Sequence, residues 1–233
     1  MDSPQPSPVT VVRTGDPFQA AANRVAELVR EAAERAGRAR LAISGGSATR
    51  TAGAAFEQLD RARFDFADLY LTWADERCVS PTAPESNRAG LQLPDRLGAT
   101  LGLFEDGERP TDAVNRVERH LIETFDGGLD IVLLGMGPDG HVASLFPGRF
   151  ARELPADRPE PLVEHVKGSP KPPPDRITLT YATLLRAQST VLVAAGESKR
   201  EALERVLRGD LALPAVGLSD LVIYTDLELG APQ

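Results

Sequence analysis

An apolar run that leads directly into a glycine-rich loop constrains the fold of this chain more than any other stretch. Residues 131–134 (Ile-Val-Leu-Leu) are all apolar, and residues 135–141 (Gly-Met-Gly-Pro-Asp-Gly-His) follow at once. A short continuous apolar run is typical of a strand buried on both faces, as in a parallel sheet. Ligands bind beyond the carboxyl ends of such strands, so we expect a functional site at this loop.

The histidine of this loop is the candidate acid or base. The imidazole of His141 titrates near neutral pH, and Asp139 stands two residues before it. The alternative is a turn that carries a surface histidine. We expect His120 to be structural or solvated and His165 to lie at the surface.

Strand-like and helical patterns alternate along the chain. Strand patterns occur at residues 9–13, 41–43, 69–73, 176–180, 189–195 and 221–224, and helical patterns at residues 17–36, 49–59, 113–125 and 199–207. With 42% apolar residues, this alternation predicts one α/β domain over residues 9–233 with a mainly parallel sheet. Residues 1–8 are expected to form a flexible tail, and the proline-rich residues 149–175 an irregular lid or rim.

Composition excludes several classes of protein. The net charge of −8 argues against a nucleic-acid surface, and no apolar run approaches the roughly 18 residues of a membrane span. The single cysteine, Cys78, rules out an intrachain disulfide and fits a cytoplasmic protein; a buried small hydrophobe is favoured over a nucleophile. The amino terminus lacks the features of a signal peptide. We expect a monomer or a weak dimer.

A glycine turn between a strand and a helix provides a candidate anion site. Ser44, Gly45, Gly46 and Ser47 follow the strand pattern that ends at residue 43. Backbone N–H groups at such a helix start carry partial positive charge and stabilise an anion, and the two serine hydroxyls could add donors. The sequence matches neither a phosphate-binding P-loop nor a dinucleotide fingerprint, and a plain tight turn remains the alternative.

Charged residues follow two other strands. Asp75, Glu76 and Arg77 come after residues 69–73, where three charges are costly unless they are paired or used. Arg77 could bind a phosphate or a carboxylate, or form a structural salt bridge. Asn87, in the next loop, is a candidate donor to a polar ligand.

Three cationic side chains in the second half of the sequence are further candidates for binding an anionic ligand. Lys171 and Arg176 bracket a run of three prolines, which would stiffen the loop; solvated charge is the alternative reading. Lys199 stands in the expected first turn of a helix, an unfavourable place for a cation unless it meets an anion. Loops from four strand ends thus predict a cleft with cations and one histidine, suited to acid–base chemistry on a phosphorylated small molecule.

The motifs then become recognisable as a family pattern. The chain resembles the 6-phosphogluconolactonase family over about residues 10–225, in family order. The matching segments are residues 133–148, residues 44–47, residues 75–77 with Asn87, residues 172–180, and Gly196 with Lys199. The resemblance implies hydrolysis of 6-phospho-D-glucono-1,5-lactone in the oxidative pentose phosphate pathway. It also implies a Rossmann-like sheet with helices on both faces, as in the sugar-phosphate isomerase and deaminase fold.

The resemblance assigns roles to the candidate residues. His141 would activate water and then protonate the leaving ring oxygen, with Asp139 orienting the ring and Arg77 or loop N–H groups stabilising the oxyanion. The substrate and its phosphate would be held by Ser44, Gly45, Gly46, Ser47, Asp75, Asn87, Arg176 and Lys199. Neither a metal nor an organic cofactor is expected, and the partner is a phosphorylated sugar lactone.

Two departures and two alternatives accompany the resemblance. Residues 48–50 (Ala-Thr-Arg) replace the usual Thr-Pro, and no histidine follows residues 213–215 (Leu-Pro-Ala). A glucosamine-6-phosphate deaminase would carry a glutamate where this chain has Phe146 and usually a tyrosine at Arg77. A non-catalytic sugar-phosphate sensor on the same scaffold is the other alternative.

Overall fold

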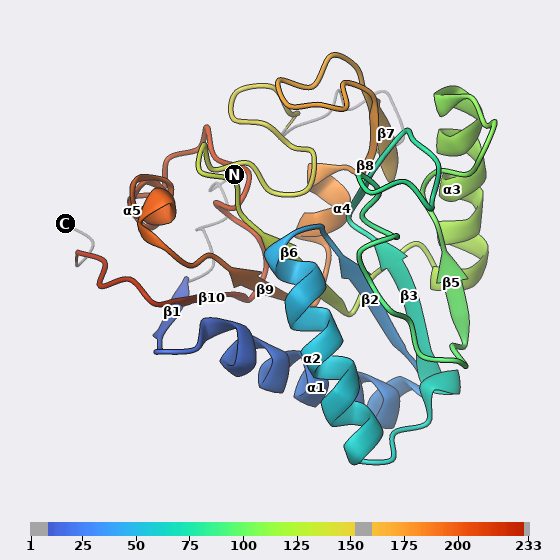
Figure 1. The fold of residues 1–233 in the computed structure, drawn as a ribbon, viewed down its shortest axis with the longest axis horizontal. Helices are drawn as coiled ribbons and strands as arrows, with labels where there is room; N and C mark the ends of the chain where they lie inside the picture. The colour runs from blue at the N-terminus through green and yellow to red at the C-terminus, as the bar shows by residue number, and fades with distance from the viewer. Residues whose placement is uncertain (1–8, 152–159, 231–233) are drawn as a thin grey trace, which may run out of the picture.

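A parallel sheet forms the centre of the molecule. The computed structural model describes residues 9–151 and 160–230, so the predicted tail at residues 1–8 lies outside the described residues. Within those ranges seven strands pair in the order β1-β10-β9-β6-β2-β3-β5, every pair parallel (Figure 1). In chain order they are β1 (Thr10–Arg13), β2 (Ala39–Ile43), β3 (Leu69–Trp73), β5 (Ala99–Leu101), β6 (Ile131–Gly135), β9 (Ser189–Val193) and β10 (Leu221–Thr225).

The apolar run of residues 131–134 forms β6, the middle strand of this sheet. It pairs with β2 on one side and β9 on the other, and the side chains of residues 131–134 are at most 1% exposed. The prediction of a strand buried on both faces is therefore confirmed. Its carboxyl end opens into the loop of residues 136–141, beside the carboxyl ends of β2 and β9.

Helices cover both faces of this sheet, as predicted. They are α1 (Pro17–Ala36), α2 (Ser47–Arg61), α3 (Pro110–Phe125), α4 (Tyr181–Leu185) and α5 (Arg200–Leu207), with short 3-10 turns η1 (Phe66–Asp68) and η2 (Glu197–Lys199). Helices α1 and α2 pack together and on β2, β6 and β9, whereas α3 contacts β5 and strands of a second sheet. The chain moves one way along the sheet from β1 to β5 and back the other way from β5 to β10, so the general right-handed rule for crossovers puts α1 and α2 on one face and α3 and α5 on the other. Within the described ranges, no helix is long and apolar enough to cross a membrane.

The ends of α1 follow from its sequence. Asp16 caps the helix by accepting a hydrogen bond from the Gln19 N–H at 3.0 Å, and Pro17 occupies the first turn, where its missing N–H costs nothing. Gly37 ends the helix with φ +72°, a left-handed conformation that glycine adopts without strain. Both signals were predicted.

A second, antiparallel sheet differs from the prediction. It consists of β4 (Asp75–Arg77), β8 (Arg176–Leu179) and β7 (Val163–Val166), in that order. The sequence predicted a strand near residues 176–180 but took residues 75–77 for a loop. It also took residues 149–175 for an irregular lid or rim, which is wrong for β7. These three strands are short, and β4 pairs with β8 about 100 residues further along the chain (Asp75 with Thr178), so local periodicity does not reveal them.

The burial of the His165 side chain is a consequence of this second sheet. The sequence placed it at the surface, but its side chain is only 14% exposed, and Nε2 lies 2.9 Å from Asp175 Oδ1. The expectation was wrong because β7 turns this side chain inward, where Asp175 is a hydrogen-bond partner. It lies apart from the cavity described below.

Candidate active site

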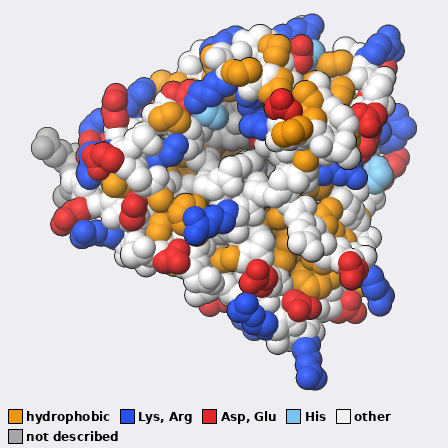
Figure 2. Space-filling view, in the orientation of Figure 1, with side chains coloured by type: hydrophobic (Ala, Val, Ile, Leu, Met, Phe, Trp, Pro, Cys, Tyr) orange, Lys and Arg blue, Asp and Glu red, His pale blue; other side chains and the backbone are white. Residues whose placement is uncertain are grey.

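A cavity of about 290 Å³ opens beyond the carboxyl ends of β2, β6 and β9. It is lined by Phe18, Ser44, Gly45, Gly46, Ser47, Asp75, Arg77, Gly135, Met136, Gly137, His141, Ala143, Arg176, Val193, Ala195 and Lys199. Figure 2 shows this face hollowed near its middle, with basic side chains and a histidine around the hollow. The structure thus gathers nine of the eleven predicted site residues around one cavity; Asp139 and Asn87 lie outside its lining.

The turn before α2 presents backbone donors to the cavity. Gly46 has φ +66° and no side chain caps the helix, so the N–H groups of its first turn are free to meet an anion. A Cβ on Gly45 would lie 2.1 Å from Asn87 Oδ1, which makes glycine necessary there.

The two serine hydroxyls of this turn hold the strand ends together. Ser44 Oγ accepts a hydrogen bond from the Gly135 N–H at 2.9 Å, and Ser47 Oγ donates to the Val193 carbonyl at 3.1 Å. The Ser47 hydroxyl proton is therefore directed to β9, which differs from the expectation that it would serve as a ligand donor. These bonds join the ends of β2, β6 and β9 and fix the floor of the cavity.

His141 is held from behind by a carboxylate and a lysine. Its Nδ1 lies 2.6 Å from Asp139 Oδ1, and Lys171 Nζ lies 3.1 Å from the same oxygen and 3.3 Å from Nδ1. The Phe146 ring packs against the imidazole, with centroids 4.9 Å apart. Because Nδ1 is engaged, Nε2 is the ring nitrogen available to a substrate. From the sequence, Lys171 is only a cation beside three prolines, because no local signal links it to a histidine 30 residues earlier.

The charges of this cluster set the protonation states. Burial lowers the pKa of His141, Asp139 opposes that shift, and Lys171 adds to it. For Asp139, burial favours the neutral acid, but the His141 hydrogen bond and then Lys171 outweigh it and lower the pKa to about 2. At neutral pH the site therefore contains a neutral imidazole beside an ionised carboxylate.

The three charges after β3 are paired or turned to the cavity. Glu76 is 3% exposed and accepts hydrogen bonds from Ser86 Oγ at 2.9 Å and the Asn87 N–H at 2.7 Å, so it anchors the loop that follows. Asp75, also 3% exposed, accepts from Ser144 Oγ at 2.7 Å. Arg77 lines the cavity and donates to the Glu85 carbonyl, while its Nε is buried without a hydrogen-bond partner.

Asn87 and Arg176 both form hydrogen bonds to protein groups that the sequence did not predict. The Asn87 side chain donates to the Asp75 carbonyl at 2.8 Å and carboxylate at 3.0 Å, which places it behind the cavity as a support for Asp75. Arg176 is 3% exposed and donates to backbone carbonyls at Lys171, Pro172 and Pro173, although it still lines the cavity.

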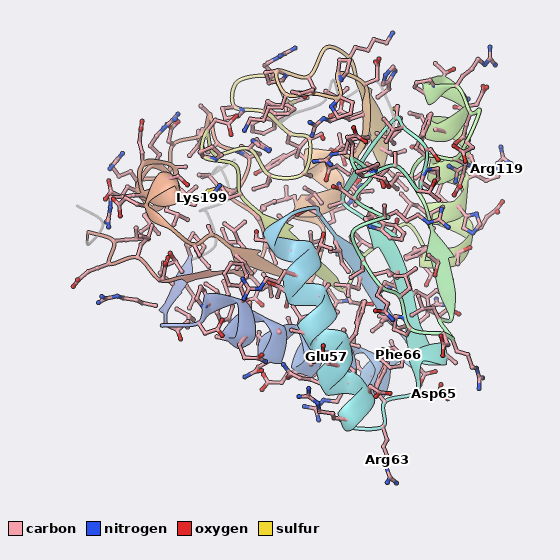
Figure 3. The ribbon with its side chains drawn as sticks, viewed as in Figure 1. Glu57, Arg63, Asp65, Phe66, Arg119 and Lys199 are labelled. Carbon is pink, nitrogen blue, oxygen red and sulfur yellow. The ribbon has the colours of Figure 1, made fainter. Side chains whose placement is uncertain are left out.

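Lys199 adds a further positive charge to the cavity lining. It is the last residue of η2, directly before α5, rather than in the first turn of that helix as predicted (Figure 3). Burial lowers its pKa, nearby Lys171 adds to that effect, and Asp139 opposes it. Among the described residues, no group of three or more His, Cys, Asp or Glu side chains is arranged to hold a metal ion.

Comparison with known proteins agrees with this geometry. A family model described as glucosamine-6-phosphate isomerases/6-phosphogluconolactonase matches residues 15–222. The chain belongs to this family. Among family members, it is 37% identical to a rat 6-phosphogluconolactonase over 204 residues, which cover 77% of this chain and 73% of the rat protein. It is 31% identical to a Mycobacterium leprae 6-phosphogluconolactonase over 85% of each chain.

Solved structures of the family share the fold. A 6-phosphogluconolactonase from Thermotoga maritima superposes with a TM-score of 0.77 at 23% identity, covering 94% of this chain and 99% of its own. A monomeric glucosamine-6-phosphate deaminase gives a TM-score of 0.72 at 21% identity, covering 94% and 97%. At these identities the likeness concerns the fold, so the choice between the two activities depends on the site.

Proposed function

We propose that this protein hydrolyses 6-phospho-D-glucono-1,5-lactone to 6-phospho-D-gluconate in the oxidative pentose phosphate pathway. The observation that carries the proposal is His141, which lines the cavity with Nδ1 engaged by Asp139 at 2.6 Å and Nε2 left for chemistry. The curated relatives that share 31–37% identity carry the name of this activity. The single cysteine supports work in the cytoplasm.

The proposed reaction uses His141 as base and then as acid. Nε2 takes a proton from water, and the resulting hydroxide attacks the lactone carbonyl carbon. Arg77 stabilises the oxyanion, because its guanidinium group lines the cavity and carries the positive charge that a developing negative charge needs. The imidazolium then returns the proton to the ring oxygen as the C–O bond breaks.

The substrate phosphate is proposed to bind opposite the base. The free N–H groups of the Gly45–Gly46–Ser47 turn and the ammonium group of Lys199 meet at the cavity. Arg176 adds positive charge from the wall. Such local charge is compatible with a net charge of −8, because exposed acids beyond about 10 Å are screened by salt. Asp75, supported by Asn87, is left to contact sugar hydroxyls.

The deaminase alternative is disfavoured by the residue that packs on the imidazole. Where the resemblance places a deaminase glutamate, this chain has Phe146, which is 3% exposed and stacks on His141. A phenyl ring has no proton to shuttle between sugar carbons, whereas lactone hydrolysis needs only one base.

The test is a coupled assay on freshly generated phosphogluconolactone with the wild type and His141→Ala. Removal of a general base should lower kcat by about 100-fold or more. Full activity in the variant would refute the mechanism. Wild-type protein that binds 6-phosphogluconate without turnover would instead favour a sensor.

A further inference from the structure

Lys171, a lysine outside the cavity lining, contacts both His141 and Asp139. Lys171 Nζ lies 3.1 Å from Asp139 Oδ1 and 3.3 Å from His141 Nδ1, on the side of the ring away from the available Nε2. Lys171 does not line the cavity. Its side chain therefore contacts the base from the Nδ1 side, whereas Lys199 lines the cavity itself.

The backbone that carries this lysine is fixed by a buried arginine. Arg176 donates from Nη2 to the Lys171 and Pro172 carbonyls, both at 3.1 Å, and from Nε to the Pro173 carbonyl at 3.2 Å. The Lys171 N–H in turn donates to Ser169 Oγ at 3.2 Å. A lysine on a fixed backbone loses less conformational freedom when it pairs, so the contact with Asp139 is cheaper to form than one made from a mobile loop.

The geometry points to Lys171 as a positioning residue that keeps His141 in its neutral form, with Nε2 toward the cavity, while Arg176 holds Lys171 in place. This inference rests on the proposed lactonase function. Lys171 touches neither the substrate nor the reacting atoms; it acts through the imidazole and through Asp139.

The electrostatic reason is that the Asp139 carboxylate favours protonation of the base, against the effect of burial. A negative charge at 2.6 Å favours the imidazolium, which cannot accept a proton from water. Burial is the largest influence and lowers the pKa of His141 against Asp139, Lys171 lowers it further, and Asp75, from β4, raises it. Arg77 on β4, Arg176 on β8 and Lys199 on η2 are the other charged groups that line the cavity.

The test follows the titration of the ring in the Lys171→Met variant. Without the lysine, burial alone opposes Asp139, and we expect the His141 titration and the acid limb of kcat/KM to move up by about one pH unit. The ring signal is followed by NMR in the protein without substrate and is assigned by its loss in His141→Gln. Lys171→Arg retains the charge and should restore the wild-type midpoint. Lys167→Met, a change of an exposed lysine in the same segment, is the matched control.

The outcomes separate this inference from the proposed function. An unchanged His141 midpoint in Lys171→Met would overturn the inference. A lower kcat at an unchanged midpoint would also overturn it, because a lysine that only holds the loop in place would lower kcat without changing the midpoint. Lys171→Gln repeats the measurement should the methionine variant not fold. If the wild type lacks lactonase turnover, only the proposed function fails, since the NMR midpoint needs no substrate.

The role of Arg176 is tested by combining variants. If Arg176 acts by holding Lys171, then Arg176→Lys should move the midpoint in the wild-type background and have little further effect on it in Lys171→Met. If Arg176 binds only the phosphate, Arg176→Lys should raise KM equally in both backgrounds and leave the midpoint in place, which would overturn this half of the inference.

Discussion

The space behind the His141 ring is so small that one methyl group should disable the proposed base. An added Cβ at Gly137 would lie 2.1 Å from His141 Nδ1 and Cε1 and 2.5 Å from Asp139 Oδ1. Ordinary contact begins near 3.4 Å, so in Gly137→Ala the ring must retreat by about 1.3 Å. That displacement breaks the 2.6 Å contact with Asp139 and moves Nε2 away from the substrate. A misplacement of about 1 Å costs roughly 100-fold in rate, and we expect that loss in kcat.

The assay for this prediction is steady-state hydrolysis of phosphogluconolactone, with thermal unfolding to confirm a folded variant. Because the added Cβ would meet His141 and Asp139 rather than a proposed phosphate ligand, KM should change little. The matched control is Gly53→Ala in α2, where an added Cβ has nothing within 4 Å, so activity should be retained. If Gly137→Ala keeps more than half of the wild-type kcat, the account of how the ring is held is refuted.

Three further predictions concern charges. Lys199→Ala should raise KM for the phosphorylated lactone about tenfold or more with a smaller effect on kcat, since a charge-assisted bond contributes about 1.5–3 kcal/mol; an unchanged KM would remove Lys199 from the phosphate site. Asp139→Asn should lower kcat and move the acid limb of the pH profile downward, because the carboxylate raises the pKa of His141; an upward shift would contradict the assignment. Asp130→Ala should destabilise the fold by about 3 kcal/mol in denaturant unfolding, because it leaves Arg40, now paired at 3.0 Å, without its carboxylate; a loss below about 0.5 kcal/mol would contradict this reasoning.

The elements that the sequence predicted well are those specified by neighbours in the chain. The β6 run, the Asp16 and Pro17 start of α1 and its Gly37 end are local signals, and the structure confirms each of them. Short strands that depend on distant partners escaped the prediction. The strand β5 has three residues, and β7 lies between proline-rich segments, so neither produces a clear periodicity.

The candidate site was predictable to the extent that the fold class was. In a parallel sheet every strand ends at the same edge, so the turn at Ser44, the charges near Arg77, the loop at His141 and the segment at Lys199 had to converge. The sequence could not assign which polar atoms form hydrogen bonds within the protein and are therefore not free to bind a ligand. Ser47 donates to a neighbouring strand and Asn87 to Asp75, and only the packed structure decides this.

The sequence by itself determined a parallel α/β sheet and the one imidazole at its carboxyl edge, because burial patterns and turn residues act over a few neighbours. The tertiary structure alone decided that Lys171 reaches Asp139 and that Arg176 holds the backbone of that lysine. The physical reason is the separation along the chain between the residues that interact. A contact between side chains 32 residues apart depends on how β8 pairs with β4, and no property of either segment taken alone specifies that pairing.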